Sequence, residues 1–227
     1  MTVCTRKELA RCLREAQEGR AERLILTIGR PLAAEINRER LIRALDLLLP
    51  LCQGSTQSIR RERDGSWYLN LRLHYRAGLR MADAWAADHL SSLSEAERIA
   101  LRRAEEIVQG VDGLPPEQQI SALMAAVHAL AVYDNPPRGT VAHGGVVNAL
   151  SVLREGRANC QGFSDAFYLL CTLAGLRAEY RLGFKGKEMH LWNGAEIQGR
   201  WIAADATAGK SGTEAELGLR RAEVGIF

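Results

Sequence analysis

Hydrophobic residues recur at helical spacing near the start of the chain, then form a short apolar run, then return to helical spacing. Thr5 and Glu8 have the spacing of a capping box, so a first helix is expected to begin there. The run LILTIG at 24–29 predicts a buried strand, and the apolar positions within 36–49 predict a second helix that stops before Pro50. This order of elements begins a small α/β unit.

A period of two residues replaces the helical period on both sides of Asp64-Gly65. An Asp-Gly dipeptide between two alternating runs is a strong signal for a β-hairpin. The apolar residues on one face of its second strand are Trp67, Leu69, Leu71 and Leu73. Residues 1–92 are therefore predicted to form a small N-terminal α/β lobe, to which the sequence assigns no role.

The helical period returns in the middle of the chain. Ser94 and Glu97 form a second capping box, which predicts a helix over 95–109. A domain boundary is expected near 91–94, just before this helix. Residues 93–227 are therefore assigned to a second domain.

The second domain is expected to hold further helices followed by strands. A Pro-Pro step opens a helix predicted over 117–133, and the Pro- and Gly-rich stretch 134–145 predicts a loop. A long, mostly apolar run begins at Cys160 and stops at Gly175, which predicts a buried helix. Three strand-like segments follow, at 178–184, 190–197 and 201–207.

Composition and charge narrow the classes of partner. The chain has 227 residues, 47% of them hydrophobic, and its 30 Lys and Arg against 27 Asp and Glu leave a net charge of +3. No dense basic stretch is interleaved with aromatic residues, so nucleic acid is not an expected partner. No signal peptide or membrane-spanning segment stands out, so we expect a cytoplasmic protein without a membrane partner. The oligomeric state is left open.

The cysteines indicate thiol chemistry at one position. There are five, an odd number, and none stands in a CxxC pattern, so a disulfide framework, a zinc site and a cofactor are not expected. Cys160 stands at the threshold of the predicted helix, where unpaired backbone N–H groups and the helix dipole favour the thiolate. The other four cysteines are interpreted as structural or incidental: Cys4, Cys12, Cys52 and Cys171.

The last two predicted strands bring a histidine and an aspartate together. A two-residue turn at 198–199 would fix their register, so that Trp192 lies opposite Asp205 and His190 lies opposite Thr207. His190 and Asp205 are then diagonal neighbours on one face, with Cα atoms about 7 to 8 Å apart. An aspartate at this distance can orient the imidazole.

A cysteine, a histidine that takes its proton and an aspartate that holds the histidine form the arrangement needed for attack on an acyl carbonyl. The residues in these roles are Cys160, His190 and Asp205. The same three side chains are possible metal ligands, although nothing in their spacing requires a metal.

The oxyanion of such a reaction needs two hydrogen-bond donors. The backbone N–H of Cys160 is the natural first donor. Candidates for the second donor are the side chains of Asn159, Gln161 and Tyr133. Trp192 is expected both to pack in the core and to form one wall of the site.

The segments LSVLREGRANCQGFSDAFYLLCTLAGL, HLWN and WIAADAT resemble, in this order, the transglutaminase-like superfamily over about 118–207. The family has a Cys-Gly-aromatic helix start, a His-x-Trp strand and an Asp-x-Thr strand. The resemblance, to bacterial domains of this kind, implies an α+β papain-like fold in which a central helix carrying the cysteine packs on an antiparallel sheet. It carries the family's catalytic residues over to Cys160, His190 and Asp205.

The resemblance and the residues together predict a cysteine-dependent enzyme that acts on amide bonds of a peptide or protein through a thioester. Family members include protein crosslinking enzymes, peptidases and relatives that cleave other amides. The motif does not separate hydrolysis from transfer to an amine, because both share the first half-reaction. A non-catalytic module that keeps the cleft for binding a peptide or protein is the alternative.

Overall fold

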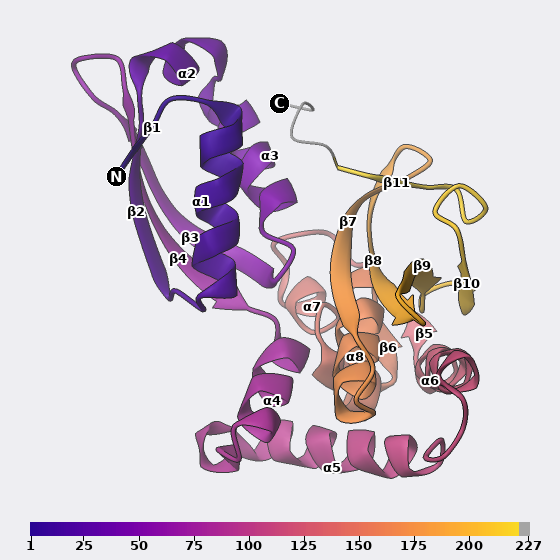
Figure 1. Ribbon diagram of the computed structural model, residues 1–227. Helices are drawn as coiled ribbons and strands as arrows, with labels where there is room; N and C mark the ends of the chain where they lie inside the picture. The colour runs from indigo at the N-terminus through magenta and orange to yellow at the C-terminus, as the bar shows by residue number, and fades with distance from the viewer. Residues whose placement is uncertain (223–227) are drawn as a thin grey trace. The chain divides into compact units, whose positions relative to one another are not determined.

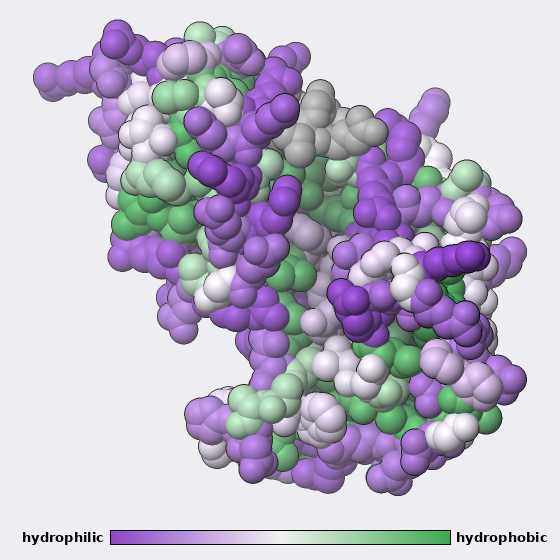
Figure 2. All heavy atoms as spheres, viewed as in Figure 1, coloured by the Kyte–Doolittle hydropathy of each residue, from purple (hydrophilic) through white to green (hydrophobic). Residues whose placement is uncertain are grey.

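The computed structural model describes residues 1–222, except for the side chains of Thr56 and His143. The chain divides into two compact units, residues 1–75 and residues 76–221 (Figure 1). Each unit has its own hydrophobic core. On the face seen in Figure 2, hydrophilic residues cover much of the surface. No helix of the described residues has the length and apolar character needed to cross a membrane.

The first unit is a four-stranded sheet with helices packed on one face (Figure 1). The strand order is β1-β2-β4-β3. The strands are β1 (Thr2–Val3), β2 (Arg23–Ile28), β3 (Cys52–Arg61) and β4 (Trp67–Tyr75). The helices are α1 (Arg6–Glu18), α2 (Arg30–Glu35) and α3 (Arg38–Leu48). The prediction of a small α/β unit is confirmed.

Local sequence signals account for these elements. Thr5 caps α1, because its hydroxyl accepts from the Glu8 backbone while the Glu8 carboxylate accepts from the Thr5 backbone. The predicted apolar face of β4 is buried: Trp67, Leu69, Leu71 and Leu73. The hairpin turns through Gly65 at φ +86°, and the Asp64 carboxylate accepts from the Ser66 backbone. The hairpin signal at this dipeptide is therefore confirmed.

The second unit surrounds one buried helix, α8 (Cys160–Leu173), with helices and an antiparallel sheet. The other helices are α4 (Ala77–Ala86), α5 (Glu95–Gln109), α6 (Pro116–Leu130) and the short α7 (Val141–Gly144), with a 3-10 turn at Leu90–Ser92 and a π-helical turn at Ser151–Glu155. The sheet order is β10-β9-β8-β7-β11. Its strands are β7 (Ala178–Lys185), β8 (Glu188–Ile197), β9 (Arg200–Asp205), β10 (Lys210–Gly212) and β11 (Leu219–Arg221). The α+β class, with a central cysteine-bearing helix on an antiparallel sheet, is confirmed.

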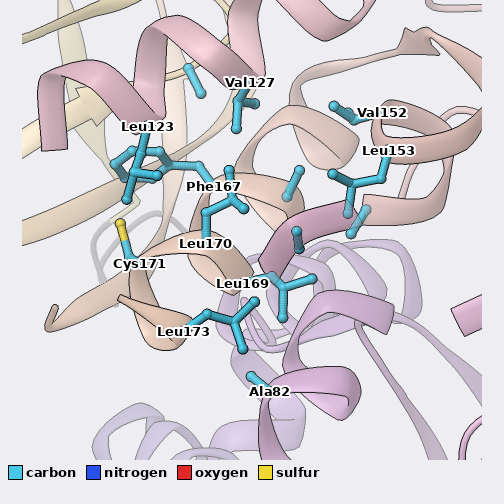
Figure 3. Packing of buried hydrophobic residues seen from close by; sticks show 14 of the residues in the cluster. Ala82, Leu123, Val127, Val152, Leu153, Phe167, Leu169, Leu170, Cys171 and Leu173 are labelled. Atoms are coloured by element: carbon cyan, nitrogen blue, oxygen red, sulfur yellow. The ribbon is translucent and has the colours of Figure 1, made fainter. Parts of the chain in front are cut away.

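The core of the second unit fixes the position of α8. Figure 3 shows residues of α8 packed among side chains from α4, α6 and the π-helical turn: Phe167, Leu169, Leu170, Ala82, Leu123, Val127, Val152 and Leu153. Full burial of a side chain of the size of Phe167 contributes about 1.5 to 3 kcal/mol. Cys171 lies in this core, where burial raises its pKa, so it is a structural residue as predicted.

One predicted helix is shorter than expected. The pattern predicts a helix through Tyr133, but α6 ends at Leu130. The next residues form β5 (Val132–Tyr133), which pairs in parallel with β6 (Arg157–Ala158). The prediction was wrong here because the backbone of this segment finds partners far along the chain: the Val132 N–H donates to the Gly156 carbonyl at 2.9 Å.

The division between the units lies after Tyr75, whereas the sequence pattern placed it near 91–94. The difference comes from α4, which the prediction included in the first lobe. Met81 and Ala82 of α4 are fully or almost fully buried in the core around α8. The helix over 95–109, which the sequence pattern also predicts, is confirmed with its capping box.

Candidate active site

Asn159 makes the helix begin at Cys160. Its backbone is extended, and its side-chain oxygen accepts from the Gln161 backbone N–H at 3.0 Å, which is an N-cap contact. Its side-chain nitrogen donates to Asn135 at 3.4 Å. Because both ends of this buried amide are engaged, Asn159 acts as the cap of α8 in this structure. The thiol is thereby held at the N-terminus of a buried helix.

Gly162 allows the first turn of α8 to pack closely on the chain before it. A Cβ at this position would lie 2.8 Å from the Val146 carbonyl oxygen and 2.9 Å from the Ala158 Cβ. Backbone atoms cannot move aside cheaply, so Gly162, two residues after Cys160, has a packing role that supports the position of the thiol.

We expect Gly162→Ala to destabilise the protein by about 1 to 3 kcal/mol, the usual result of overpacking. Thermal denaturation followed by circular dichroism measures the change. Gly144→Ala is the matched control, since a Cβ there meets nothing within 4 Å. Equal melting temperatures for the Gly162→Ala variant and the wild type would contradict the close packing.

The predicted register of the last two strands is confirmed. Ile197 pairs with Arg200 across a turn in which Gln198 and Gly199 both have positive φ, +50° and +80°. Pairing continues in this register as far as Asn193 with Ala204. The register brings β8 and β9 together with their functional side chains on one face.

His190 and Asp205 meet as this register predicts. The Nε2 of His190 lies 3.0 Å from Oδ2 of Asp205, although its N–H is not aligned with that oxygen, so the contact is a close ion pair. Both side chains are buried, and Cys160 is half-buried. The imidazole also interacts with the Cys160 thiol. The three side chains that the sequence selects are thus brought together.

The electrostatics of the site favour an ion pair between Cys160 and His190. Burial by itself would raise the pKa of the Cys160 thiol. Contact with His190, the imidazolium charge, the Leu191 backbone and the charge of Arg76 outweigh burial and lower this pKa. Burial would lower the pKa of the His190 imidazole, but its contacts with Asp205 and Cys160 raise it to about 9. The thiolate and the imidazolium are therefore favoured together.

Lys185 is a part of the site that sequence reasoning missed. Its Nζ donates to Oδ2 of Asp205 at 2.8 Å, the same oxygen that His190 approaches. Burial would raise the pKa of Asp205, yet His190 and then Lys185 lower it to about 2. A signal was available: Gly183 of β7 is opposite His190, and Lys185 is two residues further on the same face.

A cleft of about 640 Å³ opens at the thiol. Residues lining it include Cys160, His190, Gln161, Tyr133, Lys185 and Thr207. Tyr133 is 52% exposed, and partial burial together with the charges of Cys160 and Glu188 raises its pKa. Both Gln161 and Tyr133 thus remain candidates for contact with a substrate.

Trp192 has only one of its two expected roles. It is fully buried, packs with Ala203 and Leu219, and stacks on the His190 ring at 6.3 Å with an interplanar angle of 15°. It is not among the described residues that line the cleft, so the expected wall is wrong. Its ring instead stacks on the imidazole of His190 and supports it.

Within residues 1–222, no group of three or more His, Cys, Asp or Glu side chains is arranged to hold a metal ion. A paired thiolate and imidazolium beside a cleft can attack a carbonyl carbon and return a proton.

Comparison with known proteins agrees with this geometry. Residues 102–206 match the model of the transglutaminase-like superfamily. This segment belongs to the transglutaminase-like superfamily. The resemblance drawn from the three motifs is thereby confirmed, and residues 102–206 carry Cys160, His190 and Asp205 of the transglutaminase-like domain.

Individual proteins similar to this chain share it to different extents, and the chain spans only part of the length of each. The kyphoscoliosis peptidase of Homo sapiens is 33% identical over 70 residues, 26% of this chain but only 11% of that protein. A solved structure described as a TGase covers 91% of this chain and 58% of its own, with 14% identity and a TM-score of 0.45. The periplasmic domain of TgpA from Pseudomonas aeruginosa covers 68% of this chain and 63% of its own, with 16% identity and a TM-score of 0.38.

Proposed function

We propose that this protein is a cysteine-dependent acyl-transfer enzyme that acts on amide bonds. The observation that carries the proposal is the meeting of Cys160, His190 and Asp205 at the start of α8, beside a cleft. The direction of the pKa shifts supports it, because a nucleophilic cysteine needs its thiolate and a leaving amine needs a proton.

In the proposed reaction, the Cys160 thiolate attacks the amide carbonyl and forms a C–S bond. The resulting oxyanion collapses, the C–N bond breaks, and His190 gives its proton to the departing amine. A thioester on Cys160 remains. His190 then takes a proton from water or from a second amine, which attacks the thioester and releases Cys160. The product is a carboxylic acid or a new amide.

A peptide or protein is the substrate class that we propose. A cleft of about 640 Å³ has room for several side chains of an extended peptide. The peptidase in the name of the human relative supports cleavage of peptide bonds as the first reaction to test. Transfer to an amine would use the same thioester, so measuring the fate of the thioester decides between the two.

We expect iodoacetamide at pH 6 to modify Cys160 about tenfold or more faster than the exposed Cys4. An unperturbed thiol is only about 0.3% ionised at this pH, whereas the pair with His190 lowers the pKa of Cys160 and so raises its thiolate fraction. The increase in labelling rate is smaller than the increase in thiolate fraction, because the nucleophilicity of a thiolate falls as the pKa of its thiol falls. Peptide mapping over a time course measures both rates.

The same protein preparation, treated with an electrophilic peptide-like probe and analysed by intact mass, tests for acyl-transfer reactivity directly. A single adduct that maps to Cys160 is expected. Labelling of Cys160 no faster than that of Cys4, in both experiments, would favour the non-catalytic binding module.

A further inference from the structure

A buried arginine contacts the residue that follows the candidate nucleophile. Arg76 is only 3% exposed and precedes α4, far from Cys160 in sequence. Its charge lowers the pKa of the Cys160 thiol, and its guanidinium lies over the Tyr180 ring at 5.4 Å. A buried cation this close to the site has a role that neither the three motifs nor the proposed triad explains.

The charge of Arg76 acts on a fully buried carboxylate, Asp165 of α8. Asp165 accepts from the Gly78 backbone at 2.9 Å, the Ala149 backbone at 2.8 Å and the Tyr180 hydroxyl at 2.7 Å. Burial raises the pKa of Asp165, and the charge of Arg76 acts first among the groups that lower it. The carboxylate thus links α4, α8 and β7, and its negative charge attracts the buried guanidinium.

The contact from Arg76 to the cleft is made with Gln161. Nη1 of Arg76 donates to Oε1 of Gln161 at 3.3 Å. A guanidinium has no acceptor, so the oxygen of the amide must face Arg76 and its NH₂ group must face away. Gln161 follows Cys160 and lines the same cleft. The two N–H donors of the Gln161 side chain therefore point away from Arg76. They belong to the residue that directly follows Cys160.

We propose that the side-chain NH₂ of Gln161 is the second donor to the oxyanion, beside the backbone N–H of Cys160, and that Arg76 is the positioning residue that orients this amide through its hydrogen bond to Oε1. This inference rests on the proposed acyl transfer. No described residue accepts a hydrogen bond from the backbone N–H of Cys160, which leaves that donor for the oxyanion. Asn159 and its amide are used for the helix cap.

Two reactions of the same thiolate separate this role from an effect on the nucleophile. Acylation by p-nitrophenyl acetate passes through a tetrahedral oxyanion, forms the thioester and releases p-nitrophenolate. Alkylation by iodoacetamide displaces iodide at a saturated carbon and forms no oxyanion. Gln161→Met keeps the length of the side chain but removes both donors. We expect acylation by this variant to fall about 10²-fold while alkylation stays within about threefold of wild type.

Arg76→Lys keeps the buried charge but replaces the planar guanidinium that donates to Gln161. We expect it to slow acylation with little effect on alkylation. Because Arg76 acts through Gln161, the double variant should acylate no more slowly than Gln161→Met alone. Gln118→Ala, on the exposed side of α6, is the matched surface control and should behave as wild type. Circular dichroism verifies folding of each variant.

Equal rates of acylation in wild type and Gln161→Met would overturn this inference and leave the proposed function standing. Parallel loss of acylation and alkylation would also overturn it, since Gln161 would then act on the thiolate. A double variant with additive losses would remove Arg76 as the positioning residue. A wild-type protein that alkylates rapidly but never acylates would overturn the proposed function and this inference with it.

Discussion

Replacing Cys160 by alanine is expected to abolish covalent capture of p-nitrophenyl acetate and of an electrophilic peptide-like probe. The sulfur is the atom that forms the acyl bond in the proposed reaction, and neither His190 nor Asp205 can replace it at this point of the cleft. The fold should persist, because Asp205 still pairs with His190 and the core around α8 is unchanged. Intact mass measures capture, and circular dichroism measures folding.

Two other cysteines supply the controls. Cys4→Ala removes an exposed thiol and Cys171→Ala removes a fully buried one. Both variants should still capture the probe at the Cys160 site, although Cys171→Ala leaves a cavity in the core and should melt at a lower temperature. A probe adduct that persists in Cys160→Ala and disappears in Cys4→Ala would contradict this prediction, because Cys4 would then be the reactive thiol.

Asp205→Asn is expected to slow acyl transfer by roughly 10- to 10³-fold with the fold preserved. The analogous change in a serine triad costs about 10⁴-fold, since the imidazole takes the wrong tautomer. A thiolate already favoured by the helix start depends less on its base, so a smaller loss is expected here. The rate of thioester formation with p-nitrophenyl acetate and the turnover of an amide substrate measure the effect.

The variant should also change the pH dependence. The Asp205 carboxylate helps to raise the pKa of His190 to about 9, so its loss lowers that pKa. As the pH rises, the imidazolium that protonates the leaving amine therefore loses its proton at a lower pH than in the wild type. The alkaline limit of amide turnover moves to lower pH. Lys185 is 42% exposed and can turn to solvent when its partner becomes neutral. Wild-type rates and an unchanged pH profile in a folded variant would remove Asp205 from the mechanism.

Several features of this protein were determined by the sequence itself. The capping boxes at Thr5 and Ser94, the helix start at Cys160 and the turn at 198–199 all involve hydrogen bonds between residues a few positions apart. Such bonds depend on residue types in a short window, which the sequence displays directly. The pairing of β8 with β9 could be predicted for the same reason, because a two-residue turn fixes the whole register.

Only the tertiary structure decided the rest of the site. Lys185 reaches Asp205, 20 positions away, because β7, β8 and β9 pair side by side. Arg76 acts on Gln161, 85 positions away, and a contact of that range leaves no periodic signal in the sequence. The same applies to Val132, whose backbone bonds to Gly156 and so turns a predicted helix end into a strand. Which buried polar groups meet depends on how whole elements pack, and packing is set by the sum of many side chains. The sequence alone therefore selected the candidate nucleophile and its two candidate partners, and the fold added the charges that surround them.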